Sequence, residues 1–406
     1  MKEYQLSDLI EIKHGYAFDG EHIVTEDNGI VLVTPGNFKI GGGFQEDKCK
    51  FFNGEIPEEY VLSSGDYIVT MTDLSKTIDT LGYSAIVPNS KTRTYLHNQR
   101  IGLIKFISDE CDPDYIYYLM QTHKYQRAIA NTSTGATVHH TSPSKIRAYK
   151  FFAPDLESQK RIARTLRVYD DLIENNQKQI KLLEEAAQRL YKEWFVDLRF
   201  PGYENTPIID GVPQGWNVRK LETFGEIITG KTPSTAKESY YNGDIPFVKI
   251  PDMHNTIYPI ITESNLSEEG ANTQKNKFIP KDSLMVSCIA TVGLVNISVQ
   301  ECQTNQQINS IILNDVRDLY YLYFSTKGLK MLLDGVGSNG ATMTNVNKSK
   351  FANIEILYPT IELCEQFYHF CKPIFEKILV LNKSTIELKN SRDQLLPKLM
   401  SGELEV

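Results

Sequence analysis

The sequence lacks several features that would assign it to a familiar class at once. Its six cysteines form no Cys-x-x-Cys pair and have no histidine spacing that would complete a zinc site. No apolar run approaches the length of about 20 residues that a membrane span needs, and the start MKEYQLSDLI has no charged-then-apolar signal pattern. The GGGF stretch at 41–44 is not followed by Lys-Ser/Thr, so it is no phosphate loop. These absences predict a cytoplasmic protein with reduced thiols.

Positive charge is also scarce. The 406 residues carry a net charge of −8, with a hydrophobic fraction of 41% and a charged fraction of 23%. Such a composition is ordinary for a globular protein, and the length favours two or three domains. The acidic balance argues against holding nucleic acid by overall positive charge. It leaves open a local basic patch, or an acidic subunit that works beside more basic partners.

Two stretches of the sequence repeat one phrase. Residues 135–154 read GATVHHTSPSKIRAYKFFAP, and residues 340–359 read GATMTNVNKSKFANIEILYP. Both begin with Gly-Ala-Thr, both contain Ser-Lys at the same step, and both end in proline, at a constant shift of 205. A match at this separation indicates an internal duplication.

Further matches extend the repeat along both halves. The stretches LSDLIEIKHG and LETFGEIITG match at a shift of 215, and GDYIVTMT and KDSLMVSC match at 216. Next, NQRIGLI matches NQQINSI at 207, and DYIYYLM matches DLYYLYF at 204. The order of the motifs holds while the shift drifts, which is typical of a duplicated domain whose surface loops have diverged.

Each half begins with short β-branched runs bounded by Gly, Pro, Asn and Asp, which predict strands. Two later stretches, 115–132 and 320–333, have the helical spacing of apolar residues. The absence of an alternating strand–helix rhythm argues against a doubly wound sheet. The sequence therefore predicts an α+β fold with two tandem strand-rich domains.

The composition changes after each strand-rich half. Residues 155–199 contain neither Gly nor Pro, and apolar residues recur there in alternating steps of 4 and 3, with one polar break at Asn176. This heptad pattern predicts a long helix with a coiled-coil seam. The seam consists of Ile162, Leu166, Tyr169, Ile173, Asn176, Ile180, Leu183, Ala187, Leu190 and Trp194. A shift of 205 gives the second seam: Phe367, Cys371, Ile374, Ile378, Leu381, Thr385, Leu388, Arg392, Leu395 and Leu399.

The ends of both predicted helices carry capping signals. Asp155 and Thr360 each follow a proline and are expected N-caps, while Pro373 is expected to kink the second helix or break its first turns. A seam needs a partner in water, so we expect the two helices to pair antiparallel as a spacer with a pseudo-twofold axis. The alternative is two bundle helices, each packed on its own domain.

This reading divides the chain into six segments. The expected boundaries are 1–154 for the first strand-rich domain, 155–200 for the first helix, 201–215 for a Gly- and Pro-rich linker, 216–359 for the second strand-rich domain, 360–402 for the second helix and 403–406 for a tail.

The search for catalytic groups finds little. Asp155, Glu157 and Lys160 resemble a metal-nuclease string, but the second half has no acid at the equivalent of Asp155, so an N-cap is the better interpretation. His139 and His140 could be metal ligands, but the second half has Thr344 and Asn345 in about the same region. Exposed loop residues are therefore the better interpretation of the two histidines. No Asn-Pro-Pro-aromatic string for methylating a base amino group occurs. No nucleophile–base set and no metal site is predicted.

The loops between matched strands are rich in side chains that read DNA. Asn and Gln can pair with adenine, Arg and Lys with guanine, and Lys can also contact phosphate. Two different reading modules at a fixed separation suit one long ligand such as duplex DNA. The candidates are Thr72, Ser75, Lys76, Asn98, Gln99, Arg100, Thr137, His139, His140, Lys145, Asn305, Gln306, Gln307, Thr342, Thr344, Asn345, Lys348 and Lys350.

The whole chain resembles the specificity subunit of type I restriction–modification systems. The most specific stretches are LYKEWFVDLRFPG at 190–202 and LLPKLMSGELEV at 395–406, supported by PDLESQKRIARTL at 154–166 and PQGWNVRKL at 213–221. One departure concerns the Glu-Gln pair expected after each helix-opening proline. It reads Glu-Ser-Gln in the first copy and comes late, at Glu365-Gln366, in the second.

The resemblance implies that each strand-rich domain reads one half of a bipartite, asymmetric site on double-stranded DNA. It implies a helical spacer that docks two methyltransferase subunits, which bind S-adenosylmethionine, and two restriction subunits that use ATP and Mg²⁺. The chain itself would hold no cofactor and catalyse nothing. Two alternatives from other classes are a metal-dependent nuclease and a two-armed protein scaffold without DNA binding.

Overall fold

The computed structural model describes residues 1–75, 77–135, 137–329 and 346–405. The chain forms two compact units. Unit 1 comprises Met1–Ile173 and Glu387–Val406, and unit 2 comprises Glu174–Ile386. Within the described ranges, no helix has both the length and the apolar character needed to cross a membrane.

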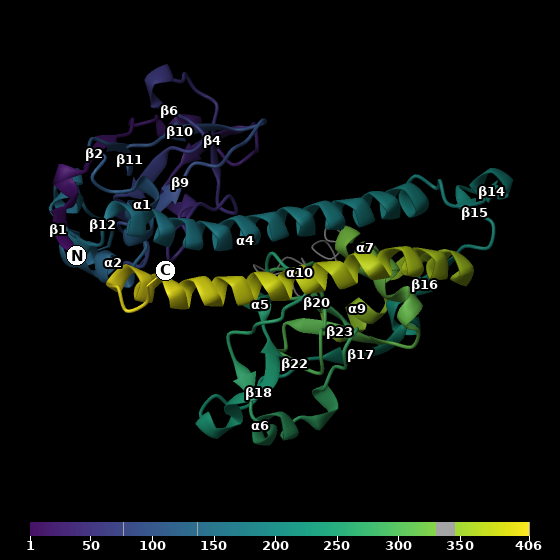
Figure 1. Ribbon diagram of the computed structural model, residues 1–406. Helices are drawn as coiled ribbons and strands as arrows, with labels where there is room; N and C mark the ends of the chain where they lie inside the picture. The colour runs from purple at the N-terminus through teal and green to yellow at the C-terminus, as the bar shows by residue number, and fades with distance from the viewer. Residues whose placement is uncertain (76, 136, 330–345, 406) are drawn as a thin grey trace. The chain divides into compact units, whose positions relative to one another are not determined.

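Unit 1 is built on two sheets, one antiparallel and one mixed (Figure 1). Its strands are β1 (Lys2–Gln5), β2 (Ile10–His14), β3 (Ile23–Val24), β4 (Ile30–Val33), β5 (Lys50–Phe52), β6 (Val61–Leu62), β7 (Tyr67–Thr70), β8 (Thr72–Asp73), β9 (Ser84–Ile86), β10 (Thr94–His97), β11 (Ile101–Phe106), β12 (His139–His140) and β13 (Lys150–Ala153). One sheet has the order β2-β11-β7-β9 and the other β3-β5-β4-β10-β6. A separate ribbon pairs β1 with β13.

Unit 2 repeats this plan with different loops. Its strands are β14 (Ile208–Ile209), β15 (Val212–Pro213), β16 (Asn217–Lys220), β17 (Gly225–Thr229), β18 (Tyr241–Val248), β19 (Asn265–Leu266), β20 (Leu284–Ser287), β21 (Val295–Ile297), β22 (Gln303–Thr304), β23 (Ile308–Leu313) and β24 (Glu355–Tyr358). The order β17-β23-β20-β21 matches β2-β11-β7-β9 strand for strand, and β16–β24 matches β1–β13. The duplication predicted from the sequence is therefore confirmed at the level of topology.

The strand register corrects one of the predicted shifts. Ile101 pairs with Thr70 in unit 1, and its counterpart Ile308 pairs with Ser287 in unit 2. The shift between β7 and β20 is thus 217, and not the 216 expected from aligning the acidic residues before these strands. Side chains alternate between the two faces of a strand, so a slip by one residue would have exchanged the faces. The pairing fixes this register, whereas a single matched Asp does not.

The shorter helices are α1 (Pro113–Leu119), α2 (His123–Asn131), α3 (Pro143–Arg147), α5 (Ile250–Met253), α6 (Glu268–Asn272), α7 (Leu319–Gly328) and α9 (Lys348–Ala352). The helical stretch predicted at 115–132 is confirmed, but it forms two helices because Thr122 interrupts it. Its Oγ1 donates to the carbonyl of Leu119 at 2.8 Å and accepts from the amide of Tyr125 at 3.3 Å, so it ends α1 and caps α2. The final part of the stretch predicted at 320–333 lies outside the described residues.

Helix α4 (Leu156–Tyr191) continues into one π-helical turn at Lys192–Val196. Asp155 caps it as predicted, since its carboxylate accepts from the amide of Ser158 at 3.0 Å and from the hydroxyl of Ser158 at 2.9 Å. The lack of Gly and Pro in this segment explains why 36 residues remain helical.

Helix α10 (Ile361–Ser401) begins after Thr360, whose hydroxyl accepts from the amide of Leu363 at 3.4 Å. Of the kink or break expected at Pro373, the break is wrong, because α10 continues through both Pro373 and Pro397. Both prolines are exposed. On the exposed side of the helix, water can bond the carbonyl that each proline leaves without an amide donor, which makes the prolines tolerable.

The predicted antiparallel pairing of the two long helices is confirmed within each unit. In unit 1 the early residues Ile162 and Leu166 of α4 share a buried cluster with Leu399 near the end of α10. In unit 2 the late residue Ala187 of α4 shares a buried cluster with Phe367 and Cys371 near the start of α10. Each long helix therefore contributes to both units. The expectation that each helix packs only on its own preceding domain is excluded.

Polar contacts accompany this pairing. In unit 1, Arg392 donates to Asp170 at 2.7 Å, and Tyr118 of α1 donates to the same carboxylate at 2.7 Å. In unit 2, Asn176 lies 3.4 Å from the hydroxyl of Ser384, so the one polar break in the first seam has a polar partner.

No seam position is exposed. The buried positions are Ile162, Leu166, Ile173, Asn176, Ala187, Phe367, Cys371, Ile378, Leu381, Thr385 and Leu399. The half-buried positions are Tyr169, Ile180, Leu183, Leu190, Trp194, Ile374, Leu388, Arg392 and Leu395.

Candidate nucleic-acid interface

Three polar segments that are far apart in the sequence meet in unit 1. Met71, between β7 and β8, donates its amide proton to the carbonyl of Arg100 at 2.9 Å. Its own carbonyl accepts from the amide of Thr141 at 3.0 Å. The segments that carry the candidates around Thr72, Arg100 and His140 therefore converge on Met71.

Unit 2 has the same backbone connection at the equivalent residues. Cys288 donates its amide proton to the carbonyl of Gln307 at 2.8 Å, and its carbonyl accepts from the amide of Val346 at 2.9 Å. These residues correspond to Met71, Arg100 and Thr141 by the shifts of the repeat. Because the loops around them differ in sequence and length, the duplicated framework presents different side chains in each unit. We call these two convergences of segments the loop junctions.

A buried carboxylate holds the first loop of the junction in unit 1. Asp73 is 1% exposed and accepts from the amides of Ser75 and Thr80 at 2.6 Å each, and from the hydroxyl of Thr80 at 2.6 Å. Burial by itself raises the pKa of Asp73, but these hydrogen bonds outweigh burial and lower the pKa below its ordinary value. The ionised carboxylate thus fixes the loop at neutral pH.

Histidines 139 and 140 belong to a short strand in this junction. Strand β12 pairs antiparallel with β8, and the Nδ1 atom of His140 lies 3.1 Å from the hydroxyl of Thr72. His140 is exposed and His139 is half-buried. Lys145 lies in the middle of α3 and donates to the carbonyl of Thr132. Among the described residues, no cluster of His, Cys, Asp or Glu could hold a metal ion.

A fourth segment joins each junction, and sequence reasoning did not assign it there. The amide of Tyr16 donates to the carbonyl of His97 at 2.8 Å, and the amide of Lys231 donates to that of Thr304 at 3.0 Å. A Cβ atom built on Gly15 or Gly230 would lie 2.2 Å from the carbonyl oxygen of Asn98 or Asn305. The matched glycines of the repeat were the available signal, because only Gly permits so close a backbone approach.

The candidates fall into three groups by their surroundings. Thr72, Asn98 and Asn305 are 3%, 8% and 7% exposed. Each forms hydrogen bonds within its own unit, so these three residues stabilise the loop junctions. The exposed candidates are Gln99, Arg100, Thr137, His140, Gln306 and Lys348, and the half-buried ones are Ser75, His139, Lys145, Gln307 and Lys350. Lys76, Thr342, Thr344 and Asn345 lie outside the described residues.

The side chains suggested for nuclease chemistry have structural roles. Asp155 caps α4, and Glu157 forms an ion pair with Lys160 at 2.9 Å one turn along the same helix. All three lie on the opening turns of a helix whose other face packs into the core of unit 1. This geometry supports the N-cap interpretation and gives no support to a nuclease centre.

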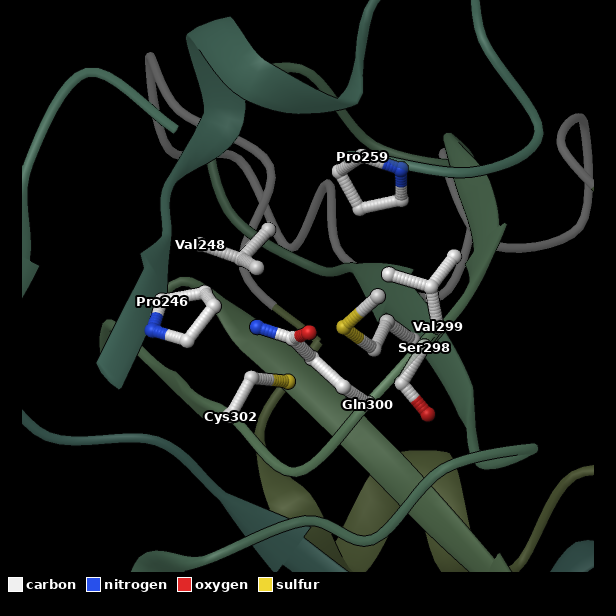
Figure 2. Close-up of a pocket in the computed structure, with 8 residues that line it drawn as sticks. Pro246, Val248, Pro259, Ser298, Val299, Gln300 and Cys302 are labelled. Carbon is white, nitrogen blue, oxygen red and sulfur yellow. The ribbon is translucent and has the colours of Figure 1, made fainter. Parts of the chain in front are cut away.

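A small cavity in unit 2 also lacks catalytic character. It is lined by Pro246, Val248, Pro259, Met285, Ser298, Val299, Gln300 and Cys302 (Figure 2). Cys302 is the one titratable group of this lining, and burial raises the pKa of its thiol to about 12. A thiol with so high a pKa is a poor nucleophile at neutral pH.

Comparisons with known proteins agree with the duplicated architecture. A family model described as "Type I restriction modification DNA specificity domain" matches residues 1–185 and again 213–390. The specificity subunit of the type I restriction enzyme HindI, from Haemophilus influenzae, is 34% identical over 356 residues, covering 72% of this chain and 77% of that protein. The MjaIX specificity subunit, from Methanocaldococcus jannaschii, is 30% identical over 341 residues, covering 80% of this chain and 76% of that protein.

A solved structure shares the fold. The S subunit of a type I restriction–modification system from M. genitalium superimposes with a TM-score of 0.62, at 14% sequence identity, and covers 98% of this chain and 96% of that one.

Proposed function

The chain belongs to the family of DNA specificity subunits of type I restriction–modification systems, and from this premise we propose that each of its two units reads one half of a bipartite, asymmetric DNA site. As a specificity subunit it is the recognition component of the system and supplies no catalytic group. Methyl transfer and cleavage belong to its partners.

The loop junctions are the observation that carries the assignment of the reading surface. Both units join the same segments by the same two backbone hydrogen bonds, at Met71 and at Cys288. At the equivalent turns the two units share a glutamine, Gln99 and Gln306, but the next residue differs, with Arg100 in unit 1 and Gln307 in unit 2. A common framework with different polar side chains is what two readers of different half-sites need.

The long helices set the separation of the half-sites in this proposal. Both α4 and α10 contribute to the cores of both units, so neither unit can be built without them. A helix rises about 1.5 Å per residue, and B-DNA about 3.4 Å per base pair, so one heptad corresponds to roughly three base pairs along parallel axes.

The complex that we propose contains further subunits. Two methyltransferase subunits would dock on the chain and bind S-adenosylmethionine, and two restriction subunits would use ATP and Mg²⁺. A repeated chain offers two equivalent surfaces, which supports a pair of each partner. The net charge of −8 is then tolerable, because basic partners would share the contact with phosphate. Host DNA as the ligand would place the chain in the cytoplasm.

The experiment that tests the spacer inserts one heptad into each helix, after Ile173 and after Ile386, where the two units meet along the chain. Methylated sites are then mapped by sequencing host DNA that carries either the wild-type or the lengthened subunit. We expect unchanged half-site sequences and a gap that grows by up to about three base pairs. Altered half-site sequences at an unchanged gap would refute the ruler.

DNA binding separates this function from that of a protein scaffold. The chain with its methyltransferase partner should bind one DNA sequence in preference to others, and binding should weaken steeply with salt. A complex whose binding ignores both the DNA sequence and the salt concentration would favour the scaffold.

A further inference from the structure

The same asparagine-centred turn stands at both loop junctions. Asn98 accepts from the amide of Arg100 at 3.0 Å, and Asn305 accepts from the amide of Gln307 at 3.1 Å. The backbone carbonyl of each asparagine also accepts a hydrogen bond from the amide three residues later, which is that of Ile101 in unit 1 and that of Ile308 in unit 2. Both asparagine side chains are more than nine-tenths buried. The turn therefore holds the backbone of its third residue, Arg100 or Gln307, in the same way in both units.

In unit 2 the hydrogen bonds fix which end of the Gln307 side chain points away from the turn. A backbone amide can only donate, so the atom of Asn305 that faces the amide of Gln307 must be Oδ1. The other terminal atom of Asn305 is then Nδ2, which can only donate. It lies 2.9 Å from the Gln307 side chain, so its partner there must be Oε1. The amide nitrogen of Gln307 is the end left for a ligand.

Neighbouring residues preserve this polarity. The hydroxyl of Thr232 donates to Oε1 of Gln306 at 2.7 Å, which also leaves the amide nitrogen of Gln306 as the outward group. In unit 1 the equivalent of Gln307 is Arg100, whose guanidinium has donors and no acceptor. Arg100 is exposed and has no carboxylate partner in the described part of the chain. Two different residues thus present only donors at the same position.

We propose that Gln307 and Arg100 are the specificity-determining residues at one equivalent position of each half-site, and that each selects a base edge made of acceptors, with guanine preferred. This inference rests on the proposed function and adds the base chemistry to it. In the major groove, guanine offers two acceptors, O6 and N7, whereas cytosine offers only its N4 donor. A glutamine that reads adenine bidentately turns both its oxygen and its nitrogen toward the base, whereas the oxygen of Gln307 is turned toward Asn305.

The first test replaces Gln307 in the full-length chain, assembled with its methyltransferase partner, and maps the methylated sites by sequencing. Gln307→Glu presents an acceptor outward and should lower methylation of sites with guanine at one position of one half-site by about tenfold to a hundredfold, in favour of cytosine. Gln307→Arg copies the turn of unit 1 and should keep guanine. The other half-site serves as an internal control, because it stays unchanged if the protein is folded.

The second test inverts the polarity without touching the reading residue. Asn305→Asp still accepts from the amide of Gln307, but its second oxygen is now an acceptor. Gln307 must then turn its nitrogen inward and its oxygen outward. We expect the same change of base preference as with Gln307→Glu, confined to the same position.

The outcomes separate the two levels of the argument. If the wild-type complex methylates no bipartite site, the proposed function fails. If the wild-type site is bipartite but Gln307→Glu and Asn305→Asp leave every position unchanged, the proposed function stands and the donor inference is overturned. A change in both half-sites at once would also overturn it, because unit 1 retains Arg100.

Discussion

The buried His97, which directly precedes the Asn98 turn of unit 1, makes the free energy of unfolding depend on pH under acidic conditions. His97 is 1% exposed, its Nε2 lies 2.9 Å from the carbonyl of Ile101, and its own carbonyl holds the amide of Tyr16. Burial lowers the pKa of His97 to about 4, and this effect outweighs the hydrogen bond to the carbonyl of Ile101, which by itself raises the pKa. The folded protein therefore keeps this imidazole neutral.

The sign and size of the effect follow from linkage. An unfolded histidine has a pKa of about 6.5, so between about pH 6.5 and pH 4 the unfolded chain binds more protons than the folded one. The contribution of the neutral His97 to the free energy of unfolding is fully present above pH 6.5 and decreases as the pH falls through this window. A difference of this size corresponds to a total loss of roughly 3 kcal/mol, of which about 2 kcal/mol is lost between pH 7.5 and pH 5.

The test compares the wild type with His97→Gln, which keeps a donor for the carbonyl of Ile101 but does not titrate. Both tryptophans, Trp194 and Trp216, lie in unit 2, so tryptophan fluorescence would not follow unit 1. Samples equilibrated in urea at each pH should instead be pulse-labelled by hydrogen exchange at one common pH and read for peptides of unit 1. The variant should lose about 2 kcal/mol less than the wild type on going to pH 5. Equal losses in both proteins would refute the reasoning.

Three further predictions concern the helices and the junctions. Leu399→Ala opens a cavity where the end of α10 packs on α4 and should lower the free energy of unfolding, measured by urea denaturation, by about 2–5 kcal/mol. The control Leu182→Ala removes an exposed side chain and should lower it by less than about 0.5 kcal/mol. Equal losses would contradict the pairing. Gly15→Ala should impair the recognition of one half-site and Gly230→Ala that of the other in methylation mapping, and impairment of both half-sites by either variant would contradict separate junctions. Asp155→Ala should lower the melting temperature slightly, whereas Asp155→Asn should retain the N-cap. Both variants should leave the methylated sites unchanged. Loss of methylation with retained stability would contradict a purely structural role for Asp155.

Periodic features of the fold could be predicted from the sequence. The heptad steps around Ile162 and the caps Asp155 and Thr360 depend on local spacing, which a single sequence displays directly. The duplication could be predicted for the same reason, since it needs only a comparison of the chain with itself.

Features that depend on the tertiary environment could not be predicted. Pro373 stays within α10 because its side of the helix is exposed, and Thr122 divides a helical stretch because its hydroxyl bonds at both ends. Neither fact is visible in local spacing. Similarly, Asn98 and Asn305 have the side chains of base readers, but burial makes them supports for the residues that follow them.

The convergence of the polar segments at the loop junctions is the part of the candidate site that needed the structure most. Sequence reasoning selected polar loops one at a time and could not show that Met71 or Cys288 joins them. The outward polarity of Gln307 depends on a chain of hydrogen bonds through Asn305, which no residue composition reveals.

The central claim is that two duplicated loop junctions in one chain read two different half-sites independently. The most direct measurement maps the methylated sites of the wild-type complex and of a complex in which residues 72–80 are replaced by the corresponding loop of another specificity subunit. The account predicts a bipartite, asymmetric site in which the loop exchange changes one half only. A contiguous wild-type site, or a loop exchange that alters both halves together, would contradict it.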